Sequence, residues 1–386
     1  MPSHWNRRMR GLPQAAAAFA GVLGLLMTSV AGAQDIVPFL ARGFDDPWTL
    51  QGAPNFSWGG WMQVGVQDLP DGAFTGNGPF LNQKEWGNLN LNQAYVFAEK
   101  GTDGSTGLDW GFRFDSMYGV DGNEGQAFGG PPGRWDFMNG FDHGIYEFAF
   151  PQAYGEVALG DVSVKVGHFY TIIGYEVVTS PDNFFLSRQL TFYNSEPFTH
   201  TGALGTVNLT ENFSATGGWV LGWDTAFDNL NSGNSFMGGI TWNIGDYVTF
   251  ISAMAAGNFG WRGDGAISSS ILSVQLTDRL STVVQGDILD TNLPAKFQDP
   301  ASFTAQNSTG LIGYTFYELT DMLALGYRGE WYKADGTSYY TNTFGVNVKP
   351  HANLIFRPEV RINDSPGDPN SVFNSTILGV DGIFLF

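Results

Sequence analysis

Hydrophobic runs joined by very short turns recur along the chain. In five places a run ends in Leu or Ile, passes through a short turn that carries an acid, and restarts: LGDV at 159–162, LTENF at 209–213, IGDYV at 244–248, LTDRL at 276–280 and LTDML at 319–323. Longer polar connections rich in Gly, Asn and Asp lie between these turns, so short and long joints alternate. In a membrane barrel, tight turns close one rim and long loops close the other. The pattern therefore predicts an all-β fold, a transmembrane, antiparallel, up-and-down β-barrel.

The short turns fix the positions of about 16 predicted strands. We expect these strands at 57–67, 89–99, 107–118, 148–159, 162–170, 200–209, 212–223, 235–244, 247–258, 267–276, 279–290, 308–318, 322–334, 339–348, 353–363 and 373–386. An even number of strands returns both termini to the same side of the membrane. The short turns then lie in the periplasm and the long loops outside the cell.

Alternation along the strands assigns the two faces of the barrel wall. In the stretch 354–362 every even position is apolar, whereas Arg357, Glu359 and Arg361 occupy odd positions. The charged face must be the lumen, because an Arg at the lipid-facing midplane costs about 2–4 kcal/mol. Both signs of charge then line one wall, which predicts a water-filled lumen. The same reasoning gives the full predicted pore-lining set: Arg113, Asp115, Glu156, Lys165, Asp287, Arg328, Glu330, Asn347, Arg357, Glu359 and Arg361.

The connection 171–199 is the predicted constriction loop. It is long and rich in aromatic residues, and it also carries Glu176, Asp182, Arg188 and Glu196. A loop with this much apolar surface should fold against something, and the barrel interior is the nearest cover. A cap over the mouth, a contact between subunits and a mobile loop are the alternatives.

The first 33 residues have the pattern of a cleaved signal peptide. Arg7, Arg8 and Arg10 are followed by an apolar stretch at 15–30 and by Ala-Gly-Ala at 31–33. We therefore divide the chain into a signal peptide at 1–33, a short periplasmic segment at 34–56 and the barrel at 57–386. The segment before the first strand is too short for a plug domain.

The composition agrees with an exported barrel rather than a soluble domain. Only 14% of residues are charged, against about 25% in ordinary soluble domains. Aromatic residues make up 15%, Gly is abundant with 52 residues, and Cys is absent. A net charge of −19 disfavours nucleic acid as a partner, and the lack of Cys excludes disulfides and Cys-ligated metals.

The C-terminal strand has a pattern that favours outer-membrane export. Leu378, Val380, Gly382, Phe384 and Phe386 share one face, and the chain ends in an aromatic residue. This pattern resembles the terminal-strand signal read by the outer-membrane assembly machinery, with Phe386 as the predicted contact. An ordinary edge strand that happens to end in Phe is the alternative.

The sequence offers little support for an enzyme. GxSxG, HExxH and P-loop patterns are absent, and His143, His168, His200 and His351 are not placed for a catalytic triad. Acidic loops at 120–125 and 363–370 could hold Ca²⁺, but neither has EF-hand spacing, and turn formation explains them better. We predict no enzymatic activity, no cofactor and no metal site.

Several segments resemble the outer-membrane β-barrel porin family described as OmpL-like. They are GGWMQVGVQ at 59–67, LNQAYVFAEK at 91–100, DWGFRFDSMYGVDG at 109–122, PQAYGEVALGDVSVKVGHFYTIIGYEVV at 151–178, SPDNFFLSRQLTFYNSEPFTHTG at 180–202 and RPEVRIND at 357–364. The resemblance is densest over 59–202 and returns near the C-terminus. It implies a porin-type protein of the bacterial outer membrane and says little about the solute.

We therefore predict an outer-membrane porin, in contact with outer-membrane lipid, through which small hydrophilic solutes or ions diffuse. The loop 171–199 would set the size limit. A structural or adhesive surface protein with a blocked lumen is the second hypothesis. A homotrimer is expected only by analogy with other barrels of this size.

Overall fold

The fold is described from a computed structural model. The description covers residues 48–49, 55–67, 89–127, 135–137, 139–228, 230–293, 305–367, 371 and 373–386. The predicted signal peptide, its cleavage site and most of the predicted periplasmic segment lie outside these residues, so the domain division stays a prediction.

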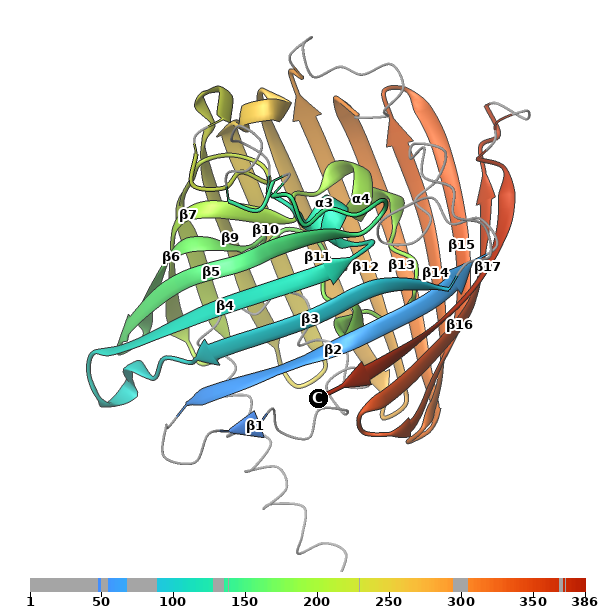
Figure 1. Ribbon diagram of the computed structural model, residues 1–386, viewed down its shortest axis with the longest axis horizontal. Helices are drawn as coiled ribbons and strands as arrows, with labels where there is room; N and C mark the ends of the chain where they lie inside the picture. Colours follow the sequence, from blue (N-terminus) through green and yellow to red (C-terminus); the bar gives the residue numbers. More distant parts are fainter. Residues whose placement is uncertain are drawn as a thin grey trace, which may run out of the picture.

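Sixteen long antiparallel strands of the described residues form a closed barrel (Figure 1). They are β2 Phe56–Gln67, β3 Asn90–Lys100, β4 Asp109–Gly119, β5 Glu147–Leu159, β6 Val162–Tyr170, β7 Thr199–Thr210, β8 Phe213–Val220, β9 Asn234–Ile244, β10 Val248–Asn258, β11 Asp264–Thr277, β12 Leu280–Thr291, β13 Asn307–Thr320, β14 Leu323–Ala334, β15 Thr337–His351, β16 Leu354–Asp364 and β17 Ser375–Leu385.

Short helical elements occur in the connections. They are η2 Gly104–Thr106, α3 Gly122–Gly125, η3 Ser180–Asp182, α4 Leu190–Ser195, η4 Leu230–Ser232 and η5 Gly260–Arg262. No helix among the described residues is long and apolar enough to span a membrane.

Pairing of the last long strand with the first closes the barrel. Residues 379–385 of β17 pair with 61–67 of β2. The terminal Phe386 extends this seam, because its N–H and C=O both form 2.9 Å hydrogen bonds with the backbone of Gly60. A two-residue strand, β1 Trp48–Thr49, pairs with Ser57 and Trp58 of β2 beyond that point.

The predicted fold class and strand number are confirmed. Each of the sixteen predicted stretches overlaps one strand, and β6 has the predicted bounds. The expected alternation of short and long joints fails once, between β14 and β15. That joint consists of Asp335 and Gly336 alone, both with positive φ (46° and 93°), as a two-residue hairpin turn requires.

The two faces of the wall differ as the alternation predicts. On β16, Phe356 and Ile362 are 41% and 43% exposed on the outer face, whereas Arg357 and Arg361 are each 1% exposed on the inner face. Apolar side chains continue around the outside on the neighbouring strands, where Tyr327 packs against Phe344 at 5.0 Å between ring centroids.

This face assignment predicts an asymmetric response to a new charge. Phe344→Arg places a cation on the lipid side in the middle of β15 and should cost about 2–4 kcal/mol, whereas Thr241→Arg on the inner face of β9 can reach water and should cost much less. Urea unfolding of both variants in lipid vesicles measures the difference. Equal losses would mean that Phe344 does not face lipid.

Candidate functional site in the barrel lumen

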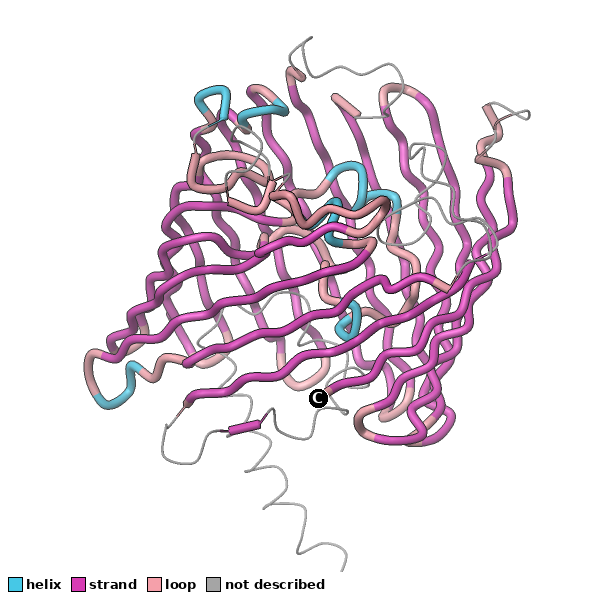
Figure 2. The backbone as a smooth tube through the Cα atoms, viewed as in Figure 1, coloured by secondary structure: helices cyan, strands magenta, loops and turns pink. Residues whose placement is uncertain are grey.

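The connection 171–199 folds into the barrel instead of standing outside it. Its side chains are nearly all buried, and its helix α4, labelled in Figure 1 and cyan in Figure 2, lies within the outline of the barrel. The apolar side chains of this loop join inward-facing wall residues in shared clusters. In one of these, Tyr175, Phe184 and Phe185 pack with Tyr314 and Phe316 of β13.

Glycines on the inner face of the wall make room for the loop. A Cβ at Gly326 or Gly310 would clash with Phe184 or Thr191, respectively. A Cβ at Gly345 would lie 2.9 Å from Phe185, and one at Gly379 would lie 2.9 Å from Leu186. We call Gly310, Gly326, Gly345 and Gly379 the glycine strip. The wall at β13–β17 is therefore shaped to receive this loop, which accounts for part of the high glycine content.

Arg328 of β14 holds the loop through a buried ion pair. Its Nη1 lies 2.6 Å from Oε1 of Glu176 and donates to the carbonyl of Ser187 at 2.8 Å, while its Nη2 donates to Ser187 Oγ at 3.0 Å. The guanidinium also lies 5.0 Å from the ring centre of Phe185. Arg328 is thus covered by the loop and not open to the lumen.

Arg357 of β16 forms the second anchor. Its Nε donates to Asp381 of β17 at 3.0 Å, and its Nη1 donates to the carbonyls of Ser180 and Asn183 at 2.8 and 2.7 Å. Asp381 also accepts a hydrogen bond from Gln63 of β2 at 2.7 Å, which ties the barrel seam to the same network.

Two wall carboxylates bind backbone N–H groups of the loop. Glu330 of β14 accepts 2.8 Å hydrogen bonds from the N–H groups of Leu190 and Thr191 at the start of α4. Glu359 of β16 accepts from the N–H of Ser187 at 3.1 Å. The acids thus satisfy backbone donors that would otherwise be buried without partners.

The remaining predicted residues of this sector are also covered. Arg361 donates to the carbonyl of Arg188 at 3.2 Å, and Arg188 donates to the carbonyl of Val177 at 2.9 Å. Burial lowers the pKa of Arg188 to about 10. Asn347 of β15 faces inward and is 1% exposed.

The opposite sector contains one charged pair that stays partly open, whereas Asp115, Glu156 and Lys165 of this sector are buried. Arg113 of β4 pairs with Glu99 of β3 at 2.6 Å, and their side chains are 21% and 34% exposed. Arg113 also donates to Asp115 at 2.8 Å. On the next strands Glu156 of β5 lies opposite Lys165 of β6. The predicted charged wall therefore divides into a covered part and an open part.

A stretch of uncharged polar residues continues this open sector. These residues face inward on β6–β10 and are half-buried, and we call them the hydroxyl wall: Ser163, Thr206, Thr216, Thr241, Asn243 and Thr249. Thr206 and Thr216 lie 3.0 Å apart, and Thr249 donates to Asn243 at 3.0 Å.

Asp182 ends η3 and lies half-buried between the two sectors. Burial raises the pKa of its carboxyl group, and the charges of Arg113, Arg188 and Lys349 act in the opposite direction. Of these cations, Arg113 belongs to β4, Lys349 to β15 and Arg188 to the loop itself.

The structure adds functional candidates to the predicted set. Asp381 and Glu99 carry charge on the inner face, and Gln63, Gln93 and Gln285 form buried hydrogen bonds with the loop or its partners. Alternation could have identified Asp381, because the even positions of the last strand face outward and Asp381 occupies an odd position. The glutamines carry no charge, so the search for charged residues missed them.

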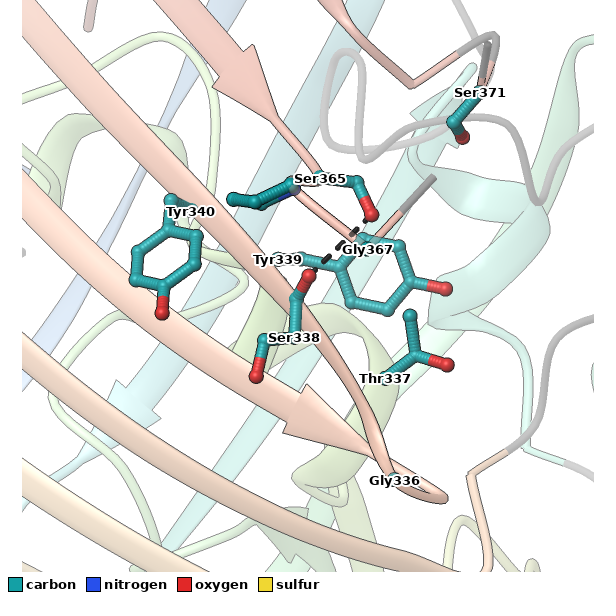
Figure 3. A pocket seen from close by; sticks show the side chains of 9 residues that line it. Gly336, Thr337, Ser338, Tyr339, Tyr340, Ser365, Gly367 and Ser371 are labelled. Carbon is teal, nitrogen blue, oxygen red and sulfur yellow. Dashed lines mark hydrogen bonds between the residues drawn. The ribbon is translucent and has the colours of Figure 1, made fainter. Parts of the chain in front are cut away.

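A separate hollow lies at the rim, where the β14–β15 turn meets the β16–β17 connection (Figure 3). Its volume is about 480 Å³. Its lining is uncharged and rich in hydroxyl groups, among them those of Thr337, Tyr339 and Ser365, and Ser365 donates to the carbonyl of Ser338 at 3.4 Å. No predicted site residue contributes to it.

The histidines are not arranged for catalysis. His168 points outward against Thr201 (2.8 Å) and Trp135, while His200 binds the carbonyl of Gly222 at 2.8 Å. Within the described residues no group of three or more His, Cys, Asp or Glu could hold a metal ion.

A closed sixteen-stranded barrel with a long loop folded against its polar interior defines a porin-type membrane protein. The residues 55–386 match the family described as "Putative beta-barrel porin-2, OmpL-like". The chain belongs to this family, as its motifs predicted. Family and fold place it among outer-membrane channel proteins rather than enzymes.

Solved structures support the same fold. An anion-selective porin from Comamonas acidovorans has a TM-score of 0.55 at 12% identity, covering 86% of this chain and 99% of that chain. The outer membrane channel DcaP of Acinetobacter baumannii has a TM-score of 0.55 at 9% identity, covering 89% and 100%. A mutant porin of Rh. blastica has a TM-score of 0.52 at 15% identity, covering 86% and 100%. No curated protein matches the chain.

Proposed function

We propose that the protein conducts small hydrophilic solutes or ions across the outer membrane and that the loop 171–199 forms its constriction. The observation that carries the proposal is the unequal burial of the inner wall. The sector at β12–β17 is covered by the loop, whereas the hydroxyl wall and the Arg113–Glu99 pair keep partial exposure. The solute path would therefore follow the β3–β10 side.

The chemistry of this side suits dipolar solutes. Hydroxyl and amide groups exchange hydrogen bonds with a passing solute, and charges of both signs at Arg113, Glu99 and Asp182 orient it. In this proposal Arg328, Arg357, Arg361, Glu330 and Glu359 position the loop and do not contact the solute.

Single-channel recording in planar bilayers tests the proposal. Ohmic openings with a stable conductance are expected from the purified protein. A correctly folded protein that never conducts would instead support the second candidate, a structural or adhesive surface protein with a blocked lumen. The deep burial of the loop is the observation that favours this second candidate.

The charge at Asp182 should set part of the ion selectivity. Asp182→Lys adds two positive charges to the proposed constriction and is expected to shift the reversal potential in a salt gradient toward anion permeation. Asp246→Lys makes the same change in the exposed β9–β10 turn and should leave the reversal potential nearly unaltered. Equal shifts in both variants would remove Asp182 from the conducting path.

The proposal includes export with cleavage after residue 33, assembly through recognition of Phe386, and a homotrimer. The mass of the mature N-terminus and the size of the complex in mild detergent test the first and last of these.

A further inference from the structure

Two acidic side chains meet where the loop 171–199 contacts β12. Glu196 comes from the loop and Asp287 from the strand, and they are 2% and 3% exposed. Gln285 lies with them and donates from Nε2 to Glu196 Oε1 at 2.6 Å and to Asp287 Oδ1 at 3.0 Å. Both acids therefore share one amide group as a donor.

The orientation of this amide is fixed by the loop itself. Gln285 Oε1 accepts hydrogen bonds from the N–H of Tyr175 at 3.3 Å and from the side-chain amide of Gln189 at 3.0 Å. Its Nε2 must therefore point at the acids. One side chain of β12 thus joins both limbs of the loop to the acid pair.

Within the described ranges, the second oxygens of the two acids lack a donor. Glu196 Oε2 and Asp287 Oδ2 are fully buried and receive no hydrogen bond from any donor among the described residues. The two carboxyl groups lie close together, because the first oxygen of each accepts from the same nitrogen of Gln285, at 2.6 and 3.0 Å. Two ionised carboxylates cannot be balanced by one neutral amide group, so one of the two acids should carry a proton.

Neither acid forms an ion pair with a cation in the described part of the chain. Glu176 on the loop and Glu330 on β14 also act on the pair, and both are acidic. Arg262 of η5 donates to the carbonyls of Asn194 and Ala305. Arg328 is already paired with Glu176. Ser269 of β11 donates to Asp287 at 2.6 Å and carries no charge. Two ionised carboxylates would repel each other strongly in this setting.

We propose that Glu196 and Asp287 share a single proton and that this proton holds the loop 171–199 against β12. The inference rests on the proposed role of the loop as the constriction. Loss of the proton would place two negative charges side by side, and the loop would leave the wall. The channel would then widen.

The direction of the pH dependence follows from linkage. Burial raises the pKa of Glu196 well above its usual range, and the charge of Asp287 raises it further. The docked loop therefore binds more protons than the released loop. Docking is fully favoured below the ordinary pKa of a Glu and is lost as the pH rises through the raised pKa of the docked state.

Thiol labelling measures docking directly, because the chain contains no Cys. Leu186→Cys places a single thiol in the loop at a site that is 1% exposed. We expect its reaction rate with a methanethiosulfonate reagent to rise at alkaline pH. Division by the rate in Leu186→Cys/Glu196→Gln removes the pH dependence of thiol ionisation. This variant serves as the reference because glutamine keeps a donor toward Asp287 without adding a second charge. The ratio should grow by up to about tenfold per pH unit between the ordinary pKa of a Glu and the raised pKa of the docked state, and level off above it.

Three comparisons decide the outcome. Leu186→Cys/Asp287→Asn should also lack the alkaline step and provides the test if the Gln variant does not fold. Leu186→Cys/Asp278→Asn, changed in the exposed turn of the same β11–β12 hairpin, should keep it. A pH-independent ratio, or the same step in all variants, would overturn the inference.

Conductance recorded over the same pH range separates this inference from the proposed function. An alkaline rise in the labelling rate without any conductance would support the shared proton and refute the channel function. A conductance that stays constant with pH, without an alkaline rise in the labelling rate, would support the channel function and refute the shared proton.

Discussion

Replacement of Arg328 by methionine is expected to release the loop 171–199 and to raise the single-channel conductance. The change removes the salt-bridge partner of Glu176 and two donors to Ser187. Breaking a buried pair from one side typically costs about 3–5 kcal/mol, because the remaining charge stays buried. Undocking of the loop lets Glu176 reach water, so the cost should appear as loss of docking rather than loss of the barrel.

Two variants control for this expectation. Arg328→Met/Glu176→Gln removes both charges and should recover part of the wild-type conductance. Arg279→Met makes the same substitution at an exposed residue of the β11–β12 turn and should have little effect. Wild-type conductance in Arg328→Met would show that the glycine strip and the other anchors hold the loop without this ion pair.

Deletion of Phe386 is expected to reduce strongly the amount of barrel assembled in the outer membrane. The residue closes the seam through two backbone hydrogen bonds to Gly60, and its ring lies so close that a Cβ at Gly60 would be 2.9 Å from it. The deletion thus removes seam contacts together with the predicted recognition signal. Heat-modifiable migration of membrane fractions on gels measures the assembled fraction.

Refolding separates the two contributions. Each lost hydrogen bond is worth about 0.5–1.5 kcal/mol, so the purified variant should still refold into detergent with reduced stability. Normal refolding together with failed assembly in cells would support recognition of Phe386. Phe384→Ala, at a lipid-facing position of the same strand, is the matched control. Full assembly of the truncated chain would contradict the predicted signal.

The strands of the barrel could be predicted from local sequence patterns, because each membrane strand alternates between lipid-facing and inward-facing residues and ends at a turn. Tight turns with an acid, such as 159–162 and 276–280, fixed the register of both neighbouring strands. Alternation then separated Arg357 from Phe356 without knowledge of any contact. The exception at Asp335 and Gly336 also has a local signal, because Asp-Gly is a preferred two-residue turn and the predicted strands at 322–334 and 339–348 leave only four residues between them.

The division of the lumen could not be predicted in the same way. Arg328 and Glu176 are 152 residues apart in the chain, and alternation shows only that Arg328 points inward. Whether water or a loop covers such a residue depends on long-range packing. The proton-sharing pair is a second example, since Glu196 and Asp287 were separate candidates with nothing in the sequence to join them.

The glycine strip has a consequence for the evolution of these barrels. The wall lacks side chains at Gly326 and Gly345, so it accepts the aromatic side chains of its own loop. Beneath a loop of different shape the same positions would leave a void. A substitution in the loop should therefore be accompanied by a compensating substitution in the wall. Pore calibre in such a lineage should change by paired substitutions on both surfaces, and transplantation of a loop alone between distant relatives should seldom succeed.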